Sequence, residues 1–329
     1  MQAARALDRC VDVVSIQHGY DIWGGPDGAL AADFARSLRL PAVATLHTVL
    51  QHPTDGQRRT LGDLLTQVVA TIVMSQSAAA LVTNQYGVDP RRLEVIPHGV
   101  PDLPMVDPET MKPGLDVTGR AVILSFGLVG PDKGYELAID ALPKVVAANP
   151  TALYVVVGAT HPDLIASDGE AYRDTLVARV RQHGMQNHVR FIDRFVGRVE
   201  LTRWLQAADV FVTPYPNLDQ SVSGTLTYAM AAGRTVVSTP YAYARELLAD
   251  GRGVLVKPGS PTLFAAALNE VLGDADLRSA IGRRAYDHTR HMVWSAVGAE
   301  YQRVLGQAAI GGGAPVIAPQ PATQAAIHV

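Results

Sequence analysis

The sequence predicts an α/β fold made of two domains, each an open parallel sheet covered by helices. Short apolar runs rich in β-branched residues alternate with longer amphipathic segments over most of the 329 residues. This alternation is typical of repeated βα units. A proline-rich stretch separates two such series. We therefore expect a first domain over 1–105, a linker over 106–120, a second domain over 121–308 and a disordered tail over 309–329.

The first series supplies four candidate strands, and the second supplies six. The first four lie at 11–16, 41–46, 70–75 and 93–97. The six others lie at 121–126, 152–157, 188–192, 209–213, 234–238 and 253–256. Six strands suit a complete doubly wound domain, whereas four make the first domain look incomplete. Two such domains facing each other would enclose a cleft at the carboxyl ends of their strands, and the last helix can return to the first domain.

Composition narrows the classes of partner and compartment. Lys and Arg number 28 against 31 Asp and Glu, for a formal net charge of −3, so we expect no nucleic-acid partner. The single cysteine, Cys10, excludes an internal disulfide and a cysteine-based metal cluster. No apolar run approaches the roughly 20 residues that span a bilayer. We expect a cytoplasmic protein, for which a peripheral contact with the inner membrane face remains open, as does the oligomeric state.

The segment S-F-G-L-V-G-P-D-K-G, residues 125–134, joins a strand to an amphipathic helix. Gly127 and Gly130 allow unusual backbone angles, and Lys133 stands at the rim of the loop. A lysine there can neutralise phosphate oxygens as a point charge. The alternative is a surface lysine in a capping turn.

A second candidate anion site lies in D-Q-S-V-S-G-T-L, residues 219–226, before an apolar helix. Ser223, Gly224 and Thr225 would present free N–H groups with little side-chain bulk. The positive end of a helix favours phosphate at such a loop. An N-cap role without any ligand explains the same residues.

Two strand ends of the first domain carry polar or aromatic residues. In A-T-L-H-T, His47 and Thr48 follow an apolar strand, so they lie at the carboxyl edge of the sheet. In S-I-Q-H-G-Y-D-I-W-G-G, residues 15–25, the strand outlet holds His18, Asp21, Trp23, Gly24 and Gly25. These residues suit contacts with sugar hydroxyls and rings. A histidine bonded to a nearby carbonyl, or a turn with an incidental aromatic residue, are the alternatives.

The other histidines have no spacing that would build a metal site, and the chain has no P-loop or nucleophile elbow. We therefore expect no metal cofactor.

Taken in order, the motifs resemble the retaining glycosyltransferases of family 4, which have the GT-B fold of two facing Rossmann-like domains. They are A-T-L-H-T, V-I-P-H-G-V, S-F-G-L-V-G-P-D-K-G, V-V-V-G, D-V-F-V-T-P-Y, S-G-T-L-T-Y-A-M-A-A-G-R-T-V-V-S-T-P and G-V-L-V. The resemblance covers residues 11–305. It implies transfer of a sugar from a nucleotide-diphosphate sugar to a saccharide, lipid-linked or small-molecule acceptor.

The resemblance also implies roles for particular residues. Lys133 matches the lysine that contacts the donor diphosphate, and His47 matches a first-domain histidine near the transferred sugar. The implied catalytic residues are His47 and Lys133, and the implied nucleotide-sugar contacts are Gly127, Gln220, Ser221, Ser223, Gly224, Thr225 and Tyr228. Gly24 and Gly25 fall in the region that faces the sugar or acceptor, and we expect Thr48 to face it too, from its place in the loop beside His47.

The sequence departs from the family pattern in three places. Gln220 and Tyr228 stand where the family has two glutamates, and Leu128 follows Gly127 where it has an arginine. Gln and Tyr can hydrogen-bond hydroxyls without charge. Family members also begin with further βα units before V-D-V-V-S-I-Q-H, so the first domain is expected to be truncated at its N-terminus.

Three functions stay open at this point. The first is an active glycosyltransferase. The second is a catalytically weak or inactive nucleotide- or sugar-binding module. The third keeps the fold but changes the chemistry to a sugar-nucleotide epimerase or a phosphorylase, and fold alone cannot separate these.

Overall fold

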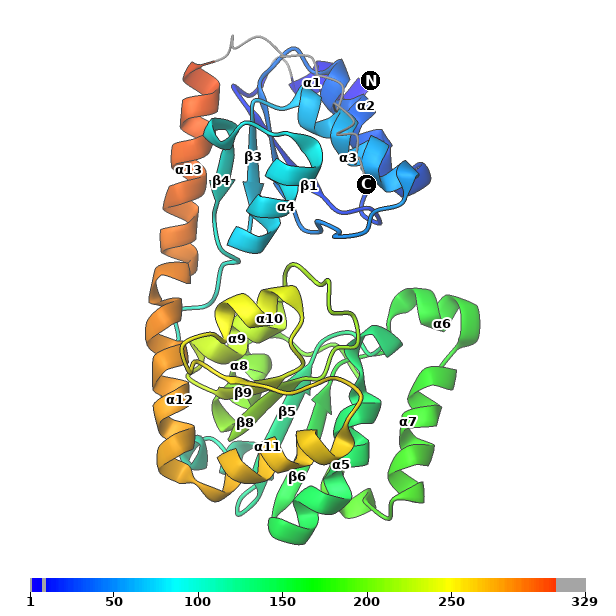
Figure 1. Ribbon diagram of the computed structural model, residues 1–329, viewed down its shortest axis with the longest axis vertical. Coiled ribbons are helices and arrows are strands. Elements are labelled where there is room, and N and C mark those ends of the chain that lie inside the picture. The colour runs from blue at the N-terminus through cyan, green and yellow to red at the C-terminus, as the bar shows by residue number, and fades with distance from the viewer. Residues whose placement is uncertain (1, 8–9, 312–329) are drawn as a thin grey trace, which may run out of the picture. The chain divides into compact units, whose positions relative to one another are not determined.

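The computed structural model describes residues 2–7 and 10–311 and confirms the predicted α/β fold with two parallel sheets (Figure 1). The chain forms two compact units. One comprises the chain up to Pro97 together with the chain from Gly298, and the other comprises His98–Val297.

The first unit contains a four-stranded parallel sheet in the order β1-β2-β3-β4. Its strands are β1 (Val14–His18), β2 (Ala42–Leu46), β3 (Ala70–Val73) and β4 (Leu93–Val95). Its helices are α1 (Gln2–Leu7), α2 (Leu30–Ser37), α3 (Asp55–Gln67), α4 (Gln76–Tyr86) and most of α13 (Trp294–Ile310). Each strand pair is joined through a helix, as parallel pairing requires.

Helices α2, α3 and α4 cover one face of this sheet with small and branched apolar residues. Ala31, Leu61 and Val82 pack there against Ile16 and Ala44. Local capping sets where the helices begin: Thr54 and Gln57 form a capping box at α3, and Ser75 caps α4.

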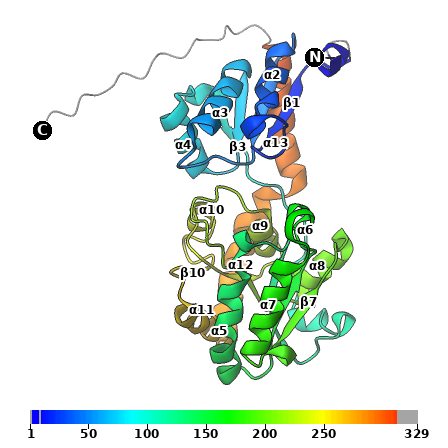
Figure 2. The same ribbon diagram turned by 90° about the vertical axis from the view of Figure 1, so that its right-hand side faces the viewer.

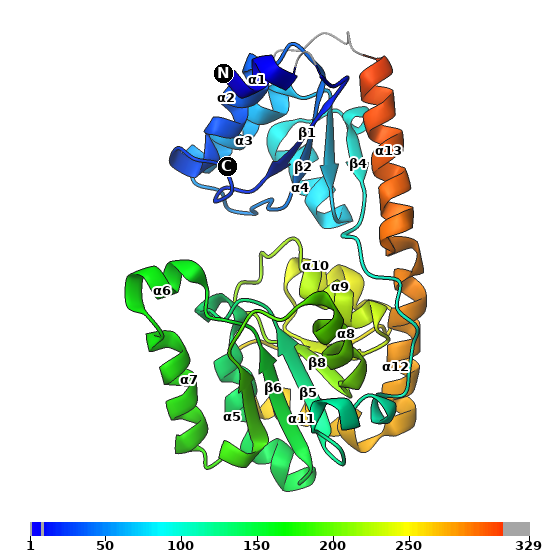
Figure 3. The ribbon, with the colours of Figure 1, turned by 180° about the vertical axis from the view of Figure 1, so that it is seen from behind.

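Helix α13 contacts the sheet through polar pairs. The Tyr301 hydroxyl donates to Thr45 Oγ1 at 3.2 Å, and Arg303 pairs with Glu94 at 2.9 Å. Helix α13 runs beside β4 in the views from both sides (Figures 1 and 3).

The second unit contains a six-stranded parallel sheet in the order β10-β9-β8-β5-β6-β7. Its strands are β5 (Ala121–Phe126), β6 (Ala152–Val157), β7 (Val189–Ile192), β8 (Val210–Thr213), β9 (Thr235–Ser238) and β10 (Val254–Leu255). Strand β5 pairs with β6 on one side and β8 on the other. The order therefore reverses between β5 and β8, and such a switch point opens a crevice at the carboxyl ends of the strands.

Helices cover both faces of the second sheet. They are α5 (Tyr135–Ala148), α7 (Ala171–Gln182), α8 (Arg198–Ala207), α9 (Gly224–Ala231), α10 (Ala242–Leu247), α11 (Pro261–Gly273) and α12 (Ala275–His288). The short helix α6 (Pro162–Asp168) buries no residue. Helix α11 lies before the sheet in Figure 1, and α8 lies before it in Figure 3. Figure 2 shows α7 beside the edge strand β7.

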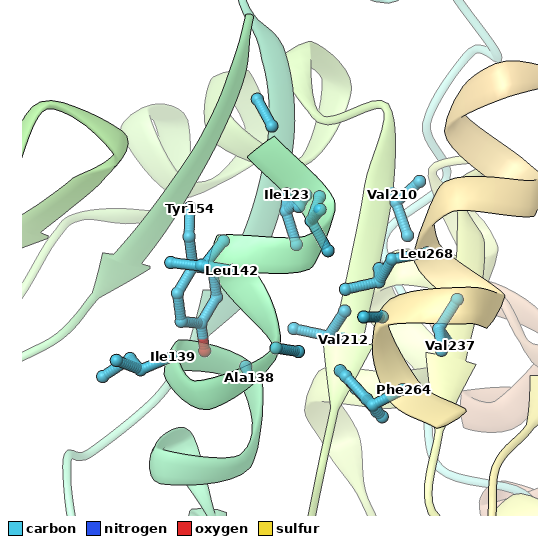
Figure 4. Close-up of a cluster of buried hydrophobic side chains, with 14 of the residues drawn as sticks. Ile123, Ala138, Ile139, Leu142, Tyr154, Val210, Val212, Val237, Phe264 and Leu268 are labelled. Carbon is cyan, nitrogen blue, oxygen red and sulfur yellow. The ribbon is translucent and has the colours of Figure 1, made fainter. Parts of the chain in front are cut away.

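Alternate residues of each strand enter opposite cores. Ile123 and Val212 pack against α5 and α11 through Leu142 and Phe264 (Figure 4). The residues next to Ile123 and Val212 along their strands, and Val236 of β9, pack on the other face against α8 to α10: these neighbours are Val122, Leu124 and Phe211. Strands buried on both faces explain why the sequence reads as continuous apolar runs.

The predicted linker, 106–120, lies within the second unit. Val117 belongs to its core, and the fully buried Lys112 pairs with Asp209 at 2.8 Å and with Glu109. Arg234 adds a bond to the Val106 carbonyl at 2.8 Å. Prolines stop helices and strands but do not prevent packing. The segment is therefore held in place by Val117 and by the buried pair of Lys112 with Asp209.

At the other end of the chain, α13 continues to Ile310, and residues 312–329 of the predicted tail fall outside the described residues. No helix within the described ranges combines the length and the apolar character that a membrane crossing needs.

Candidate functional site

The loops after β5 and β8 meet at the switch point of the second sheet. Gly134 has φ 62°, and a Cβ atom on it would lie 2.2 Å from the Pro214 carbonyl oxygen. Only glycine permits both that backbone angle and that approach. The loop that carries Lys133 is therefore seated directly on the segment that follows β8.

Lys133 is mostly buried, with a side chain 20% exposed. Its Nζ lies 2.7 Å from Asp132 Oδ2 and 5.0 Å from the centre of the Tyr215 ring. Burial alone would lower the pKa of Lys133, but Tyr215 and Asp132 outweigh burial and raise the pKa. The ammonium is therefore charged at neutral pH, and Asp132 is its anionic partner in this structure.

The loop before α9 brings hydroxyl groups to the same place. Ser223 caps the helix by accepting from the Leu226 N–H at 3.3 Å. Thr225 Oγ1 lies 3.1 Å from Ser223 Oγ and 2.7 Å from the Tyr215 hydroxyl. Ser223 is buried, and no acidic residue lies in the first turn of α9. The helix dipole therefore meets no negative side chain at its N-terminus.

Gln220 and Ser221 hold the start of this loop. Gln220 Nε2 donates to the Val222 carbonyl at 2.9 Å, and Ser221 is buried. The side-chain amide of Gln220, which the family resemblance implies as a nucleotide-sugar contact, thus donates within its own loop. Its Oε1 is the acceptor that remains for a ligand.

Gly127 lies beside Thr225. It has φ 130°, its N–H donates to the Val157 carbonyl at 3.0 Å, and a Cβ on it would lie 3.6 Å from Thr225 Cγ2. The backbone at the end of β5 is therefore free of side-chain bulk next to the α9 loop. Leu128, which stands at the position of the family arginine, is 36% exposed.

Tyr228 lies one turn into α9. Its ring centre is 6.3 Å from that of Phe126 and 6.1 Å from that of His98. The His98 ring also lies against the start of the helix, because a Cβ on Gly224 would come within 2.9 Å of its Nε2. Sequence reasoning missed His98, although it follows a strand in the quoted motif V-I-P-H-G-V.

In the first unit, His47 lies at the carboxyl edge of the sheet as predicted. The backbone N–H of His47 donates to the His18 carbonyl at 2.8 Å. In the side chain, the ring nitrogen Nε2 lies 2.8 Å from Gln17 Oε1. Burial lowers the pKa of His47. Thr48 follows it and is half-buried.

His18 is the residue whose environment the sequence did not reveal. It ends β1, is fully buried, and neither ring nitrogen has a hydrogen-bond partner among the described residues. Burial and, next, His47 lower the pKa of His18 to about 4, against a smaller opposing effect of Asp21. Such an unsatisfied buried ring lowers the stability of the folded state.

A tight turn follows β1. Gly25 has φ 83°, Gly24 accepts from the Leu30 N–H at 3.1 Å, and both glycines are exposed. Trp23 Nε1 donates to the Gln17 carbonyl at 2.8 Å, and its ring packs on Phe34. Trp23 is thus part of the turn's own packing.

The structure brings together Gly127, Lys133, Ser223 and Thr225 in the second unit, and His47 with Gln17 and His18 in the first. Within the described parts of the chain, no three side chains of His, Cys, Asp or Glu are grouped to hold a metal ion.

The family model described as "Glycosyl transferases group 1" matches residues 107–288, and that described as "Glycosyltransferase Family 4" matches residues 2–102. The D-inositol 3-phosphate glycosyltransferase of Jonesia denitrificans is 27% identical over 304 residues, 85% of this chain and 68% of the relative. Its counterpart in Geodermatophilus obscurus is 30% identical over 292 residues, 82% of this chain and 62% of the relative. The chain thus spans about two thirds of the length of these relatives.

Among solved structures, the chain resembles Anabaena Alr3699/HepE in complex with UDP and glucose. The TM-score is 0.76 at 19% identity, over 93% of this chain and 80% of that one. This likeness confirms the GT-B fold that the motifs imply. Together with the family match, it shows that the chain belongs to the group 1 glycosyl transferases.

Proposed function

We propose that the protein transfers a sugar, with retention of configuration, from a nucleotide-diphosphate sugar to an acceptor hydroxyl. One observation carries this proposal: at the switch point, the Lys133 ammonium and the Thr225 hydroxyl at the start of α9 both contact the side chain of Tyr215. Cations and free N–H groups at that edge suit a diphosphate. The UDP bound by the Anabaena neighbour supports the same class of donor.

The chemistry follows from where charge develops. The bond between the sugar C1 and the diphosphate oxygen breaks, C1 bonds to the acceptor oxygen, and the proton of the acceptor hydroxyl leaves with the phosphate. Negative charge therefore grows on the departing diphosphate. We propose that Lys133 and the N–H groups of Gly224 and Thr225 stabilise that charge and that no metal ion is needed.

For the sugar and acceptor, we propose contacts from the first unit. The half-buried His47 and the exposed Gln17 amide offer donors and acceptors that match sugar hydroxyls. The named relatives act on inositol 3-phosphate. A phosphorylated polyol is therefore the first acceptor to try, followed by saccharide and lipid-linked acceptors.

The second candidate function is a binding module without turnover. The specific observation in its favour is that Gln220, Tyr228 and Leu128 bring no charge to positions where the family has two glutamates and an arginine. On this view the second unit binds nucleotide, and no sugar is transferred.

One experiment separates the two functions. UDP, GDP and ADP sugars are screened by thermal shift and calorimetry, and donors that bind are incubated with inositol 3-phosphate. Mass spectrometry detects product, and NMR assigns its anomeric configuration. Acceptor-dependent release of nucleotide diphosphate that Lys133→Ala abolishes would support the transferase. Binding without release would support the module, and no binding at all would reject both.

A further inference from the structure

Tyr215 lies at the meeting point of the two loops that form the proposed diphosphate site. It follows β8 by two residues and is 4% exposed. Its carbonyl accepts from Thr239 Oγ1 at 2.6 Å, and its ring stacks on the fully buried Tyr241 with centroids 5.2 Å apart. The side chain is therefore held in one place by packing and by its own backbone.

The two ends of this side chain contact different loops. Lys133 Nζ, from the loop after β5, lies over the face of the ring, 5.0 Å from its centre. The hydroxyl lies 2.7 Å from Thr225 Oγ1, which in turn lies 3.1 Å from Ser223 Oγ, in the loop before α9. A desolvated cation over an aromatic ring is stabilised by the quadrupole of the ring, and a buried hydroxyl needs a partner.

We infer that Tyr215 is a positioning residue that couples Lys133 to the Ser223–Thr225 loop, so that the two halves of the phosphate site are held as one preorganised unit. This inference rests on the proposed function and extends it to a residue that is not expected to touch the ligand. Asp132 Oδ2 also lies 2.7 Å from Lys133 Nζ. The ring of Tyr215 therefore keeps the ammonium near the loop when a phosphate replaces that carboxylate as its partner.

Two substitutions separate the two roles. Tyr215→Phe removes the hydroxyl and keeps the ring, so we expect nucleotide affinity to fall about threefold to tenfold, the effect of one hydrogen bond. Tyr215→Leu also removes the ring, so we expect a further loss of about fivefold to thirtyfold. Calorimetry with UDP, GDP and ADP measures the dissociation constants, using the nucleotide that the wild-type protein binds most tightly.

Double-mutant cycles provide a readout that general destabilisation would not change. With Thr225→Val in place, Tyr215→Phe should have no further effect on nucleotide affinity, because its partner hydroxyl is gone. With Lys133→Ala in place, Tyr215→Leu should bind nucleotide no more weakly than Tyr215→Phe, because no cation remains over the ring.

Tyr286 is a matched control in the same unit. Arg290 lies 3.8 Å from its ring centre, and its hydroxyl donates to the Leu103 carbonyl at 3.0 Å. Tyr286→Phe and Tyr286→Leu thus remove the same two kinds of contact elsewhere, and nucleotide affinity should stay as in wild type.

The outcomes are distinct. If wild-type protein binds a nucleotide and Tyr215→Phe binds it equally well, the inference is wrong while the proposed function stands. The inference is also wrong if Tyr215→Phe and Thr225→Val reduce nucleotide affinity additively in the double mutant. If Tyr215→Leu does not fold, the cycle of Tyr215→Phe with Thr225→Val decides alone. If the wild-type protein binds none of the three nucleotides, the proposed function fails and the inference falls with it.

Discussion

The carbonyl oxygen of Gly127 occupies the position that a side chain on Gly158 would need: a Cβ atom there would lie 1.9 Å from it. Gly158 also has φ 149°, which L-residues rarely adopt. The ends of β5 and β6 can approach this closely only because residue 158 is glycine, and Gly127 itself has a φ of 130° that favours glycine. The proposed phosphate site depends on that approach, since Gly127 lies beside Thr225.

Gly158→Ala should therefore displace the loop after β5. We expect a loss of about 3 kcal/mol or more in the free energy of unfolding and at least a tenfold loss of nucleotide affinity. Urea unfolding and calorimetry measure the two effects. Gly306→Ala is the control, because an added Cβ in α13 meets no atom within 4 Å and should stabilise the protein by about 0.5–1 kcal/mol. Unchanged affinity in Gly158→Ala would show that this approach does not shape the site.

Lys133→Ala should reduce turnover about 100-fold or more, because the charge on the leaving diphosphate would lose its cation. Steady-state release of nucleotide diphosphate measures the effect. Lys144→Ala provides the comparison: Lys144 lies on the adjoining helix α5 and donates to Thr262 Oγ1 at 2.7 Å. If both variants turn over at the wild-type rate, Lys133 does not act on the leaving group.

The buried His18 predicts a pH dependence of stability. Its pKa is about 4 in the folded protein and 6.5 in the unfolded chain. Above pH 6.5 it is neutral in both states. As the pH falls from 6.5 to about 4, the unfolded chain takes up a proton that the folded state does not, so stability falls by about 3 kcal/mol. Below pH 4 this contribution changes no further.

His18→Asn should remove that dependence. Urea unfolding between pH 7.5 and 4 should give a flatter curve for the variant than for wild type. Some slope should remain, because the pKa of His47 is also lowered by burial. Parallel curves for the two proteins would contradict the burial of a neutral His18.

Arg173 should be a stability residue for the loops around Gly158. It is buried, and its Nη2 lies 2.8 Å from the Gly158 carbonyl and 2.7 Å from Asp193 Oδ1, while Nε donates to Thr160 Oγ1 at 3.1 Å. A lysine cannot reach all three acceptors, so Arg173→Lys should cost about 2–3 kcal/mol in urea unfolding.

The exposed pair of Arg36 with Asp33 is the control for this prediction. Its atoms lie 2.8 Å apart and both side chains are more than half exposed, so Arg36→Lys should change stability by less than about 0.5 kcal/mol. Equal effects at the two arginines would mean that the buried contacts of Arg173 are not stabilising.

Gln220→Glu tests the neutral residue at a family glutamate position. The Gln220 amide donates to the Val222 carbonyl. A carboxylate there would lose the donor and face a carbonyl oxygen, so the loop should shift and nucleotide affinity should fall about tenfold. Calorimetry measures it. Improved affinity would instead show that the site still accepts the family's charge.

Much of the element pattern was predictable, because it depends on local periodicity. The runs at 121–126 and 152–157 match β5 and β6 without change, since strands buried on both faces read as apolar throughout. The segment 106–120 was predicted as a linker from its prolines, whereas Lys112 and Val117 are buried in the second unit. A lysine in a proline-rich stretch gives no local signal of a buried partner 97 residues later, at Asp209.

The sequence by itself determined which residues end strands and begin helices, because propensity, glycine and capping act over a few neighbours. It thus placed Lys133 and His47 in loops that follow strands, and the Ser223–Thr225 loop at the start of a helix. Only the tertiary structure decided which strand ends are neighbours. Because β5 pairs with β8, Lys133 lies over the Tyr215 ring and the Tyr215 hydroxyl contacts Thr225. In the first unit, the packing around β1 buries His18. Those contacts depend on strand order and side-chain packing across distant parts of the chain, which local pattern does not encode.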